Sequence, residues 1–298
     1  MFYTRLCQIL DIKYPIIQGG MAWAATHELA QAVSNAGGLG VIAAGNAPKE
    51  VIREEIRKLR LQTDKPFGVN IMLMSPFAED IIDLVCEERV PVVTTGAGNP
   101  GKYIERLKNS GIKVLPVVPT VALARRLERE GVDALIVEGT EAGGHIGELT
   151  TMAIVPQITK AVDIPVVAAG VQMGTRFVCS TECIAHQNYK ERIVKAKDRD
   201  AIVTGRSTGY PVRVLKNKFT KEYIELEKTG VSARKLEELG AGRLRIAVMD
   251  GDIDNGSVMA GQIAGMIEDV KPCEKIINNI IEEAEIELNR LNSLSRGE

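Results

Sequence analysis

The chain has 298 residues, of which 45% are hydrophobic and 26% are charged, and its net charge is −2. This length and composition fit one large α/β domain, or a barrel with a small accessory domain. No apolar run approaches the roughly 20 residues that span a bilayer, so we expect no membrane segment. Aromatic residues make up only 4% and no nucleic-acid-binding motif occurs, so we expect no nucleic-acid partner.

Short apolar segments recur along the first 177 residues, each followed by a helical pattern. Most are continuous Val/Ile runs, which are typical of parallel strands buried on both faces. Amphipathic stretches such as residues 48–60 and 120–131 predict helices between them. The pattern predicts an α/β fold, a TIM-type (β/α)8 barrel, rather than an open doubly wound sheet, because no GxGxxG motif follows the first strand. The predicted strands are residues 14–20, 39–45, 66–73, 90–98, 113–120, 134–139, 164–170 and 171–177.

One connection that a complete barrel needs is missing. The seventh predicted strand ends at Gly170 and the eighth begins at Val171. Two neighbouring parallel strands need a crossover of about a dozen residues or more. The crossover between strands 7 and 8 is therefore missing after Gly170, either as a true deletion or as a segment dropped from the sequence. We expect a break here, with the two Cα atoms further apart than the usual ~3.8 Å.

The pattern changes after Phe177. Residues 188–200 look helical and basic, residues 201–213 irregular, and residues 214–228 and 232–239 helical. We therefore expect a barrel over residues 1–184, a small accessory or lid region over 185–255, and C-terminal helices over 256–298 that pack on the barrel. The last helix predicts such packing because one of its faces carries Ile277, Ile280, Ile281, Ala284, Leu288 and Leu291.

Basic residues are concentrated between Lys190 and Lys221, where ten Lys or Arg and three Asp or Glu give a local charge of +7. On an otherwise acidic chain, this basic stretch fits an anionic partner, although many charge runs are only solvated helix faces.

The cysteines indicate reduced thiols and a cytoplasmic location. Their number is five, which is odd, and they are scattered along the chain. Cys179, Cys183 and His186 have a spacing that could suggest zinc, but a fourth ligand is missing. We therefore expect no metal site.

Residues 137–151, VEGTEAGGHIGELTT, carry the strongest local signal for a functional site. The apolar run 134–137 ends in a glycine-rich segment with one histidine, His145. Glycines let a large ligand lie against backbone N–H groups, and histidine handles protons near neutral pH. The alternative is a plain turn with an exposed histidine.

In a TIM barrel the chemistry lies at the carboxyl ends of the strands. Here those ends combine polar side chains with bare glycine backbone, so we expect a flat, sizeable, phosphorylated ligand. They comprise residues 18–21, Gly45, Asn46, Asn70, residues 95–98, Glu138, Gly170, Gly174 and Thr175.

Several motifs in a fixed order now make a family recognisable. The chain resembles the FMN-dependent enoyl-acyl-carrier-protein reductases of type II, within the wider nitronate monooxygenase (2-nitropropane dioxygenase-like) superfamily. The matching segments run nearly end to end. They are YPIIQGGMAW, NAGGLGVIAAGNAP, KPFGVNIML, VVTTGAGNP, VEGTEAGGHIGELTT, VQMGTRF and GSVMAGQIAG.

The resemblance implies a role for each matching site residue. Around FMN, it implies ring contacts from Gly20, Met21 and Ala22, hydrogen bonds from Asn70 and Glu138, and a backbone path under the ribityl–phosphate arm at Ala142, Gly143 and Gly144. It implies phosphate contacts from Gln172, Gly174 and Thr175, and it places Gly170 beside the loop that surrounds the phosphate. Gln262 is implied to close over the cofactor. His145 is the implied catalytic residue, with a purely structural or nicotinamide-positioning role as the alternative. The family's phosphate loop after Gly170 is absent here, which puts FMN affinity in question.

Three functions follow from this resemblance. The first is reduction of trans-2-enoyl-acyl-carrier-protein thioesters in fatty-acid synthesis by NADH or NADPH. Acyl carrier protein would then dock on the basic stretch. The second is oxidation of alkyl nitronates with O2, and the third is a non-catalytic barrel that has lost its phosphate loop. A homodimer is expected because two-fold dimers are the commonest oligomers.

Overall fold

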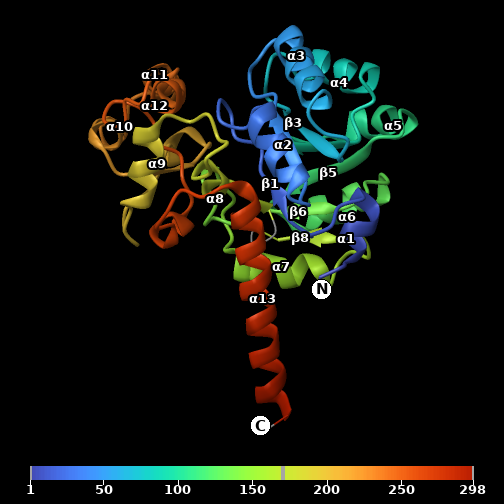
Figure 1. Cartoon of the computed structure of the whole chain (residues 1–298). Coiled ribbons are helices and arrows are strands. Elements are labelled where there is room, and N and C mark those ends of the chain that lie inside the picture. Colours follow the sequence, from blue (N-terminus) through green and yellow to red (C-terminus); the bar gives the residue numbers. More distant parts are fainter. Residues whose placement is uncertain (1, 169–171, 297–298) are drawn as a thin grey trace.

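The structure is a computed structural model that describes residues 2–168 and 172–296. Its first part is a wall of parallel strands (Figure 1). β2 to β6 and β8 form one six-stranded sheet, β1 pairs with β9, and a bridge between Ile17 and Leu39 joins β1 to the β2 edge. Residues 175–177 of the eighth predicted strand form part of a helix instead, whereas the predicted parallel barrel strands are otherwise confirmed. They are Ile17–Gln18 (β1), Gly40–Ala43 (β2), Phe67–Met72 (β3), Val92–Gly96 (β4), Lys113–Val118 (β5), Leu135–Val137 (β6), Val166–Val167 (β8) and Gln172–Met173 (β9).

Helices cover the wall because each presents an apolar stripe to it. In α3, the buried residues Ile52, Ile56 and Leu59 recur at helical spacing and share a core with Val69 of β3. The stretches predicted at 48–60 and 120–131 are confirmed as α3 and α6. The helices are Arg5–Leu10 (α1), His27–Asn35 (α2), Lys49–Arg60 (α3), Ala78–Glu87 (α4), Gly101–Asn109 (α5), Val121–Arg129 (α6), Thr151–Thr159 (α7) and Thr175–Val178 (α8).

The inside of the barrel is filled with apolar side chains. Val41, Leu115 and Ile136 from the wall share one buried cluster with Leu6 and Leu10 of α1. This filled interior, to which α1 contributes, leaves the carboxyl ends of the strands as the place for a ligand.

The wall is incomplete at one seam. β8 ends at Val167 and β9 begins at Gln172, and no pairing joins these two strands within the described chain. The predicted break after Gly170 falls on residues 169–171, which lie outside the described residues.

The accessory region differs from its prediction in its first half. The basic helix is shorter, Gln187–Val194 (α9), and residues 201–213 are not irregular. Ala201–Thr204 (β10) and Val212–Leu215 (β11) form an antiparallel hairpin around Arg206–Thr208 (η1). The predicted helices follow as Lys218–Lys228 (α10) and Ala233–Gly240 (α11), then Arg243–Met249 (α12) and Gln262–Met266 (η2). The proposed division into three regions stays a prediction.

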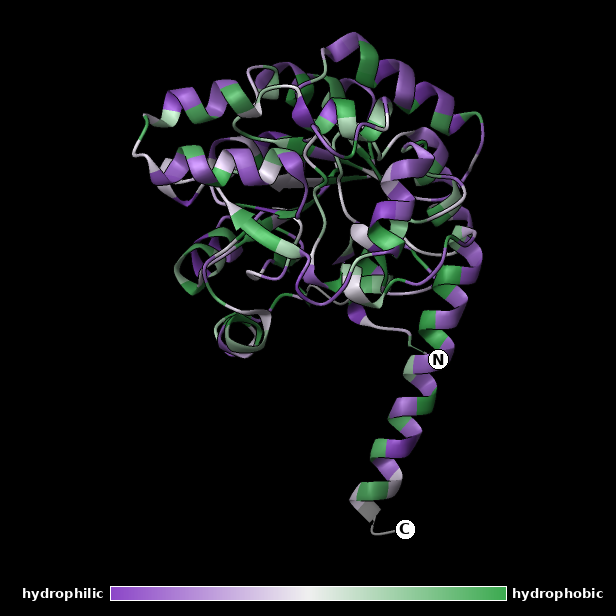
Figure 2. Ribbon diagram, turned by 90° about the vertical axis from the view of Figure 1, so that its left-hand side faces the viewer, coloured by the Kyte–Doolittle hydropathy of each residue, from purple (hydrophilic) through white to green (hydrophobic). Residues whose placement is uncertain are grey.

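The last helix, Cys273–Arg296 (α13), extends away from the body of the molecule (Figures 1 and 2). Ile277 is fully buried, whereas Leu288 and Leu291 are 45% and 53% exposed. The expected packing therefore holds for the first turns of the helix and is wrong for its distal half. Among the described helices, none has both the length and the apolar character needed to cross a membrane.

Candidate functional site

The carboxyl ends of β1 and β3 meet at one point. Gly20 follows β1, and a Cβ atom built on it would lie 2.4 Å from Cβ of Asn70 in β3. Only glycine permits so close an approach. The Asn70 amide donates a hydrogen bond to Thr94 Oγ1 at 2.9 Å, which fixes the orientation of its carbonyl oxygen. The structure thus brings together two residues that the sequence assigned to one site.

Glu138 directly follows β6 and is half-buried. Desolvation raises the pKa of Glu138 to about 7, because burial disfavours the charged carboxylate. Within the described chain, its carboxyl group has no hydrogen-bond or ion-pair partner. A desolvated carboxyl group without a partner among the described residues is a candidate position for a water molecule or a ligand.

The accessory hairpin holds the loop that contains His145. Gly144–His145 (β7) pairs with β11 in an antiparallel register, with His145 opposite Val212. The buried Arg213 donates two hydrogen bonds to the carbonyl oxygen of Thr140, at 3.0 and 2.8 Å. This anchor was missed in the sequence, where Arg213 counted only as one charge of the basic stretch. An arginine within the apolar run VRVL was the available signal.

Residues 256–265, the late glycine segment, pack against the other side of the same loop. A Cβ atom on Gly143 would lie 2.6 Å from the backbone nitrogen of Gly261. Gln262 donates its N–H to the carbonyl oxygen of Glu141 at 3.0 Å, although its side chain is exposed. The Gly261 N–H in turn donates to Thr175 Oγ1 at 3.0 Å. Contacts that are distant in sequence therefore fix the path of residues 141–143.

The expected phosphate contacts lie at the seam of the barrel. A Cβ atom on Gly174 would lie 3.3 Å from Met21 Sδ, so the end of β9 lies beside the end of β1. The backbone N–H of Gln172 donates to Ala168 O at 3.2 Å, and its side-chain nitrogen lies 3.8 Å from the Cβ position of Gly19, beside the end of β1. Gly170 lies outside the described residues.

His145 is exposed as a residue, yet neighbouring atoms crowd its ring. This desolvation lowers the pKa of His145, because the charged imidazolium loses solvation. The imidazole is therefore neutral at neutral pH, and it fits a hydrogen-bond donor better than a strong acid.

Comparison with known proteins places the chain in a family. A family model described as nitronate monooxygenase matches residues 3–84 and 74–283. The chain belongs to the nitronate monooxygenase family. With its relatives it is an oxidoreductase.

Three similar proteins match the chain over nearly its whole length. The structure of FabK from Thermotoga maritima is 47% identical, with a TM-score of 0.96, and the match covers 99% of this chain and 100% of that one. A probable nitronate monooxygenase of Staphylococcus saprophyticus is 32% identical, over 96% of this chain and 99% of its own. An indene-carboxyl-CoA dehydrogenase of Mycobacterium tuberculosis is 29% identical, over 98% of each chain.

The strand ends of this family member fit a flavin. Gly20 and Gly143 permit backbone contacts that a Cβ atom would block, and the carboxyl group of Glu138 has no partner in residues 2–168 and 172–296. No described atom lies within 4 Å of the Cβ position of Gly96, so space is open at the end of β4. Ala22 lies near Gly45, with its Cβ atom 3.5 Å from the Cβ position of that glycine. A planar ring with polar edges matches these surroundings.

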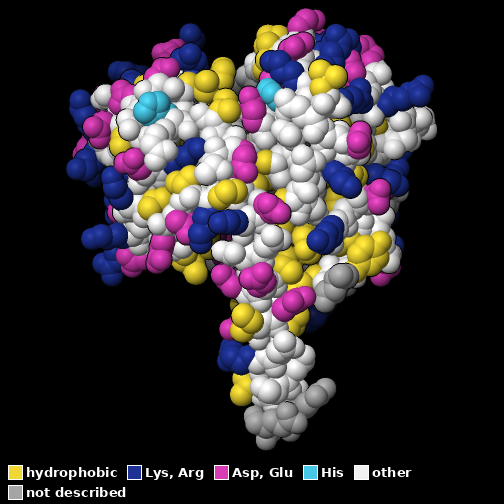
Figure 3. Space-filling model, viewed as in Figure 1, with side chains coloured by type: hydrophobic (Ala, Val, Ile, Leu, Met, Phe, Trp, Pro, Cys, Tyr) yellow, Lys and Arg dark blue, Asp and Glu magenta, His cyan; other side chains and the backbone are white. Residues whose placement is uncertain are grey.

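Only some of the basic side chains between Lys190 and Lys221 are exposed at the surface. Lys190 is buried and donates to the carbonyl oxygens of Ser180 and Cys183. Arg192 donates to the carboxylate of Asp200 and to the carbonyl oxygen of Lys216. Arg213 is buried as the anchor of the Thr140 carbonyl oxygen. Lys and Arg side chains along the outer edge of the accessory region are interspersed with Asp and Glu (Figure 3). The exposed members of the stretch are Lys195, Lys197, Arg199, Arg206, Lys216, Lys218 and Lys221.

The cysteine and histidine cluster has structural roles. Cys179 is buried, and desolvation raises the pKa of its thiol to about 12. Cys183 Sγ contacts Ala24 O at 3.6 Å, and His186 Nδ1 accepts from the Asn188 N–H at the start of α9. All five cysteines are free thiols.

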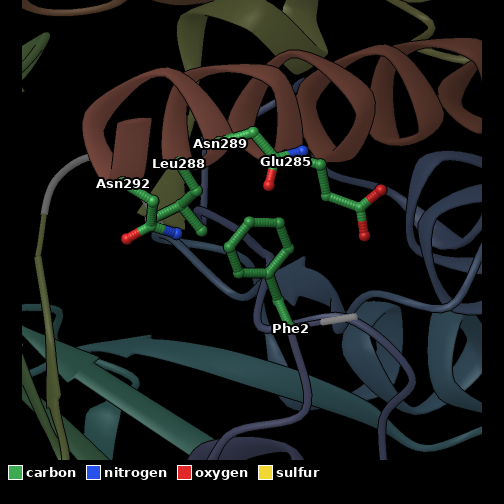
Figure 4. Close-up of a pocket in the computed structure, with 5 residues that line it drawn as sticks. All are labelled: Phe2, Glu285, Leu288, Asn289 and Asn292. Atoms are coloured by element: carbon green, nitrogen blue, oxygen red, sulfur yellow. The ribbon is translucent and has the colours of Figure 1, made fainter. Parts of the chain in front are cut away.

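A cleft of about 420 Å³ lies elsewhere, between the N-terminal segment and the distal half of α13 (Figure 4). Its lining contains no residue from the strand ends, so it does not belong to the site. The lining residues are Phe2, Glu285, Leu288, Asn289 and Asn292.

Proposed function

We propose that the chain binds FMN at the carboxyl ends of its strands and uses NADH or NADPH to reduce trans-2-enoyl thioesters of acyl carrier protein. The proposal is carried by the glycine-lined site, in which Glu138 has no side-chain partner among the described residues, in a chain that is 47% identical to FabK from end to end. The motif resemblance to the type II reductases supports the same function.

FMN, when bound, supplies hydride transfer from NAD(P)H to the β-carbon of the thioester. We assign Gly20, Met21, Ala22 and Asn70 to its ring, and Glu138 to a hydrogen bond with its polar edge. Ala142, Gly143 and Gly144 contribute backbone beneath the ribityl–phosphate arm. The phosphate contacts come from the seam residues Gln172, Gly174 and Thr175, and Gln262 covers the cofactor.

His145 acts on the substrate. Its neutral imidazole donates a hydrogen bond to the thioester carbonyl oxygen, where negative charge develops when hydride reaches the β-carbon. Solvent then supplies the proton for the α-carbon. The lowered pKa supports this assignment over direct proton donation by an imidazolium.

The acidic carrier protein docks on the exposed side chains of the basic stretch, among them Lys197 and Arg199. A homodimer in the cytoplasm is part of the same proposal, and the free thiols support that location.

Nitronate oxidation is the second candidate, favoured by the name of the matching family and by the probable nitronate monooxygenase at 32% identity. It needs neither NAD(P)H nor a carrier protein. Rapid reduction of bound flavin by NAD(P)H therefore separates the two functions.

The proposal is tested by anaerobic oxidation of NAD(P)H in the presence of FMN and a trans-2-enoyl thioester, attached either to acyl carrier protein or to coenzyme A. Exclusion of oxygen removes idle oxidase turnover. Thioester-dependent turnover with a lower KM for the carrier-protein form supports the proposal. Bound flavin without turnover favours nitronate oxidation. A chain of verified full-length sequence that binds no FMN at micromolar concentration is a non-catalytic barrel.

A further inference from the structure

Trp23 adopts a backbone conformation that its own packing does not explain. It is the only tryptophan of the chain, its φ is +69°, and its side chain is 49% exposed. The left-handed region is unfavourable for a bulky residue, and such residues concentrate where a ligand or another surface needs them. The turn is fixed by hydrogen bonds from Ala24 N and Ala25 N to Met21 O, at 3.1 and 2.9 Å.

The accessory region places a cation over this ring. The Arg245 guanidinium, from α12, lies 5.8 Å from the ring centroid. Within the described chain its one hydrogen-bond partner is Asp250, at 3.3 Å, and both side chains are about half exposed. Such an exposed pair is weak and leaves donors free for an anion. Met249 lies one helical turn further along α12 and is 39% exposed. Barrel and accessory region thus present an aromatic ring, a guanidinium and an apolar side chain to solvent.

We propose that Trp23 and Arg245 bind the adenosine diphosphate half of NAD(P)H. The exposed part of the indole stacks on the adenine, and the guanidinium pairs with the phosphates. This inference rests on the proposed use of NAD(P)H. Trp23 is two residues from Met21, so their Cα atoms are within about 8 Å of each other. In this proposal the nicotinamide lies over the flavin ring, and the adenosine diphosphate half leaves the barrel mouth past Trp23.

The first test needs no turnover. Because Trp23 is the only tryptophan, tryptophan fluorescence of the full-length, FMN-loaded protein reports on this site alone. ADP-ribose, which has no nicotinamide, is expected to quench it saturably, whereas nicotinamide mononucleotide is not. Arg245→Met retains the fluorophore and should weaken ADP-ribose binding about tenfold. The matched control Arg234→Met changes an arginine of α11 that is 87% exposed and should bind normally. Absence of saturable quenching by ADP-ribose overturns the proposal.

The second test is kinetic. Trp23→Leu should raise the KM for NAD(P)H roughly tenfold, from the loss of base stacking, and change kcat and the KM for the thioester less than about twofold. With reduced nicotinamide mononucleotide as donor, wild type and variant should be alike. A rise only in the KM for the thioester would assign the pair to the acyl substrate. A loss of thermal stability with both KM values unchanged would mean that Trp23 and Arg245 only stabilise the contact between the barrel and the accessory region. Either of these two results refutes the proposal. If the chain lacks reductase activity altogether, the ADP-ribose titration still decides this site.

Discussion

The barrel wall and the accessory region contribute to the site in different ways. Along β3 and β4, five residue pairs in register hold Asn70 opposite Thr94, so the wall supplies fixed strand ends. The accessory region supplies no strand end, yet it anchors the loop that carries His145 through β11 and Arg213. In the proposed function the wall alone holds the cofactor ring, whereas the position of His145 depends on both regions.

The largest effect is expected at His145 itself. His145→Ala should lower kcat about 100- to 1,000-fold, because a hydrogen-bond donor to the developing oxyanion is lost, while FMN affinity stays near that of the wild type. Anaerobic turnover and flavin titration measure the two quantities. His186→Ala, at the start of α9, is the matched control and should turn over normally. Full activity of the His145 variant would leave this residue only a structural role.

Gly143 tests the contact between the loop and the late glycine segment. Gly143→Ala places a Cβ atom 2.6 Å from the Gly261 backbone, so the loop must shift. We expect FMN affinity to fall roughly tenfold to 100-fold, equivalent to about 1–3 kcal/mol of overpacking. Fluorescence titration of FMN measures the affinity. Gly240→Ala is the control, since apart from its own helix and chain neighbours no described atom lies within 4 Å of its Cβ position. Equal FMN affinity in both variants would show that the loop path does not matter.

Arg213 tests the anchor from the accessory hairpin. Arg213→Met removes two charged hydrogen bonds to Thr140 O and should cost about 1.5–3 kcal/mol of folding free energy, with a parallel loss of turnover. Arg213→Lys keeps the charge but not the paired geometry and should recover only part of this loss. Urea unfolding and steady-state kinetics measure both effects. Arg206→Met, in the exposed turn of the same hairpin, should change neither stability nor turnover of the coenzyme A thioester, and an equal effect there would argue against a specific anchor.

Glu138 tests the wall alone and is expected to have the smallest effect. Its pKa in the folded state, about 7, is above the ordinary 4.5, so the folded state retains the proton between these values and loses stability as pH rises through them. Glu138→Gln should therefore be stabilising by about 1–3 kcal/mol near pH 8 and nearly neutral below about pH 4.5, in FMN-free protein. Glu148→Gln, at an exposed position nearby, is the matched control. A pH-independent difference for Glu138→Gln would contradict the desolvated carboxyl group.

The sequence predicted the wall far better than the accessory region. Buried parallel strands such as β3 and β4 are continuous apolar runs, and α3 carries its own amphipathic stripe, so local pattern was enough. The hairpin of β10 and β11 was missed because its short strands flank Gly205, Gly209 and Pro211, and its pairing with Gly144–His145 joins segments about 70 residues apart.

The same difference holds within the site. Gly20, Asn70 and Glu138 could be predicted as site residues because they lie at strand ends, a position that the order of elements reveals. Arg213 was not found, because its partner, the carbonyl oxygen of Thr140, carries no side-chain signal. The exposed distal half of α13 was also unpredictable, since an apolar stripe does not reveal where the body of the protein ends.

A double-mixing, stopped-flow experiment tests whether NAD(P)H reduces the bound flavin and whether the reduced flavin then reacts with the enoyl thioester. The FMN-loaded protein is first reduced anaerobically with NADH or NADPH, and then mixed with a trans-2-enoyl thioester, with a nitronate, or with oxygenated buffer. An enoyl thioester reductase should show rapid flavin reduction in the first mix. Its reduced flavin should then be reoxidised by the thioester faster than by oxygen. Slow reduction by both nucleotides, or reoxidation by oxygen alone, would contradict this function.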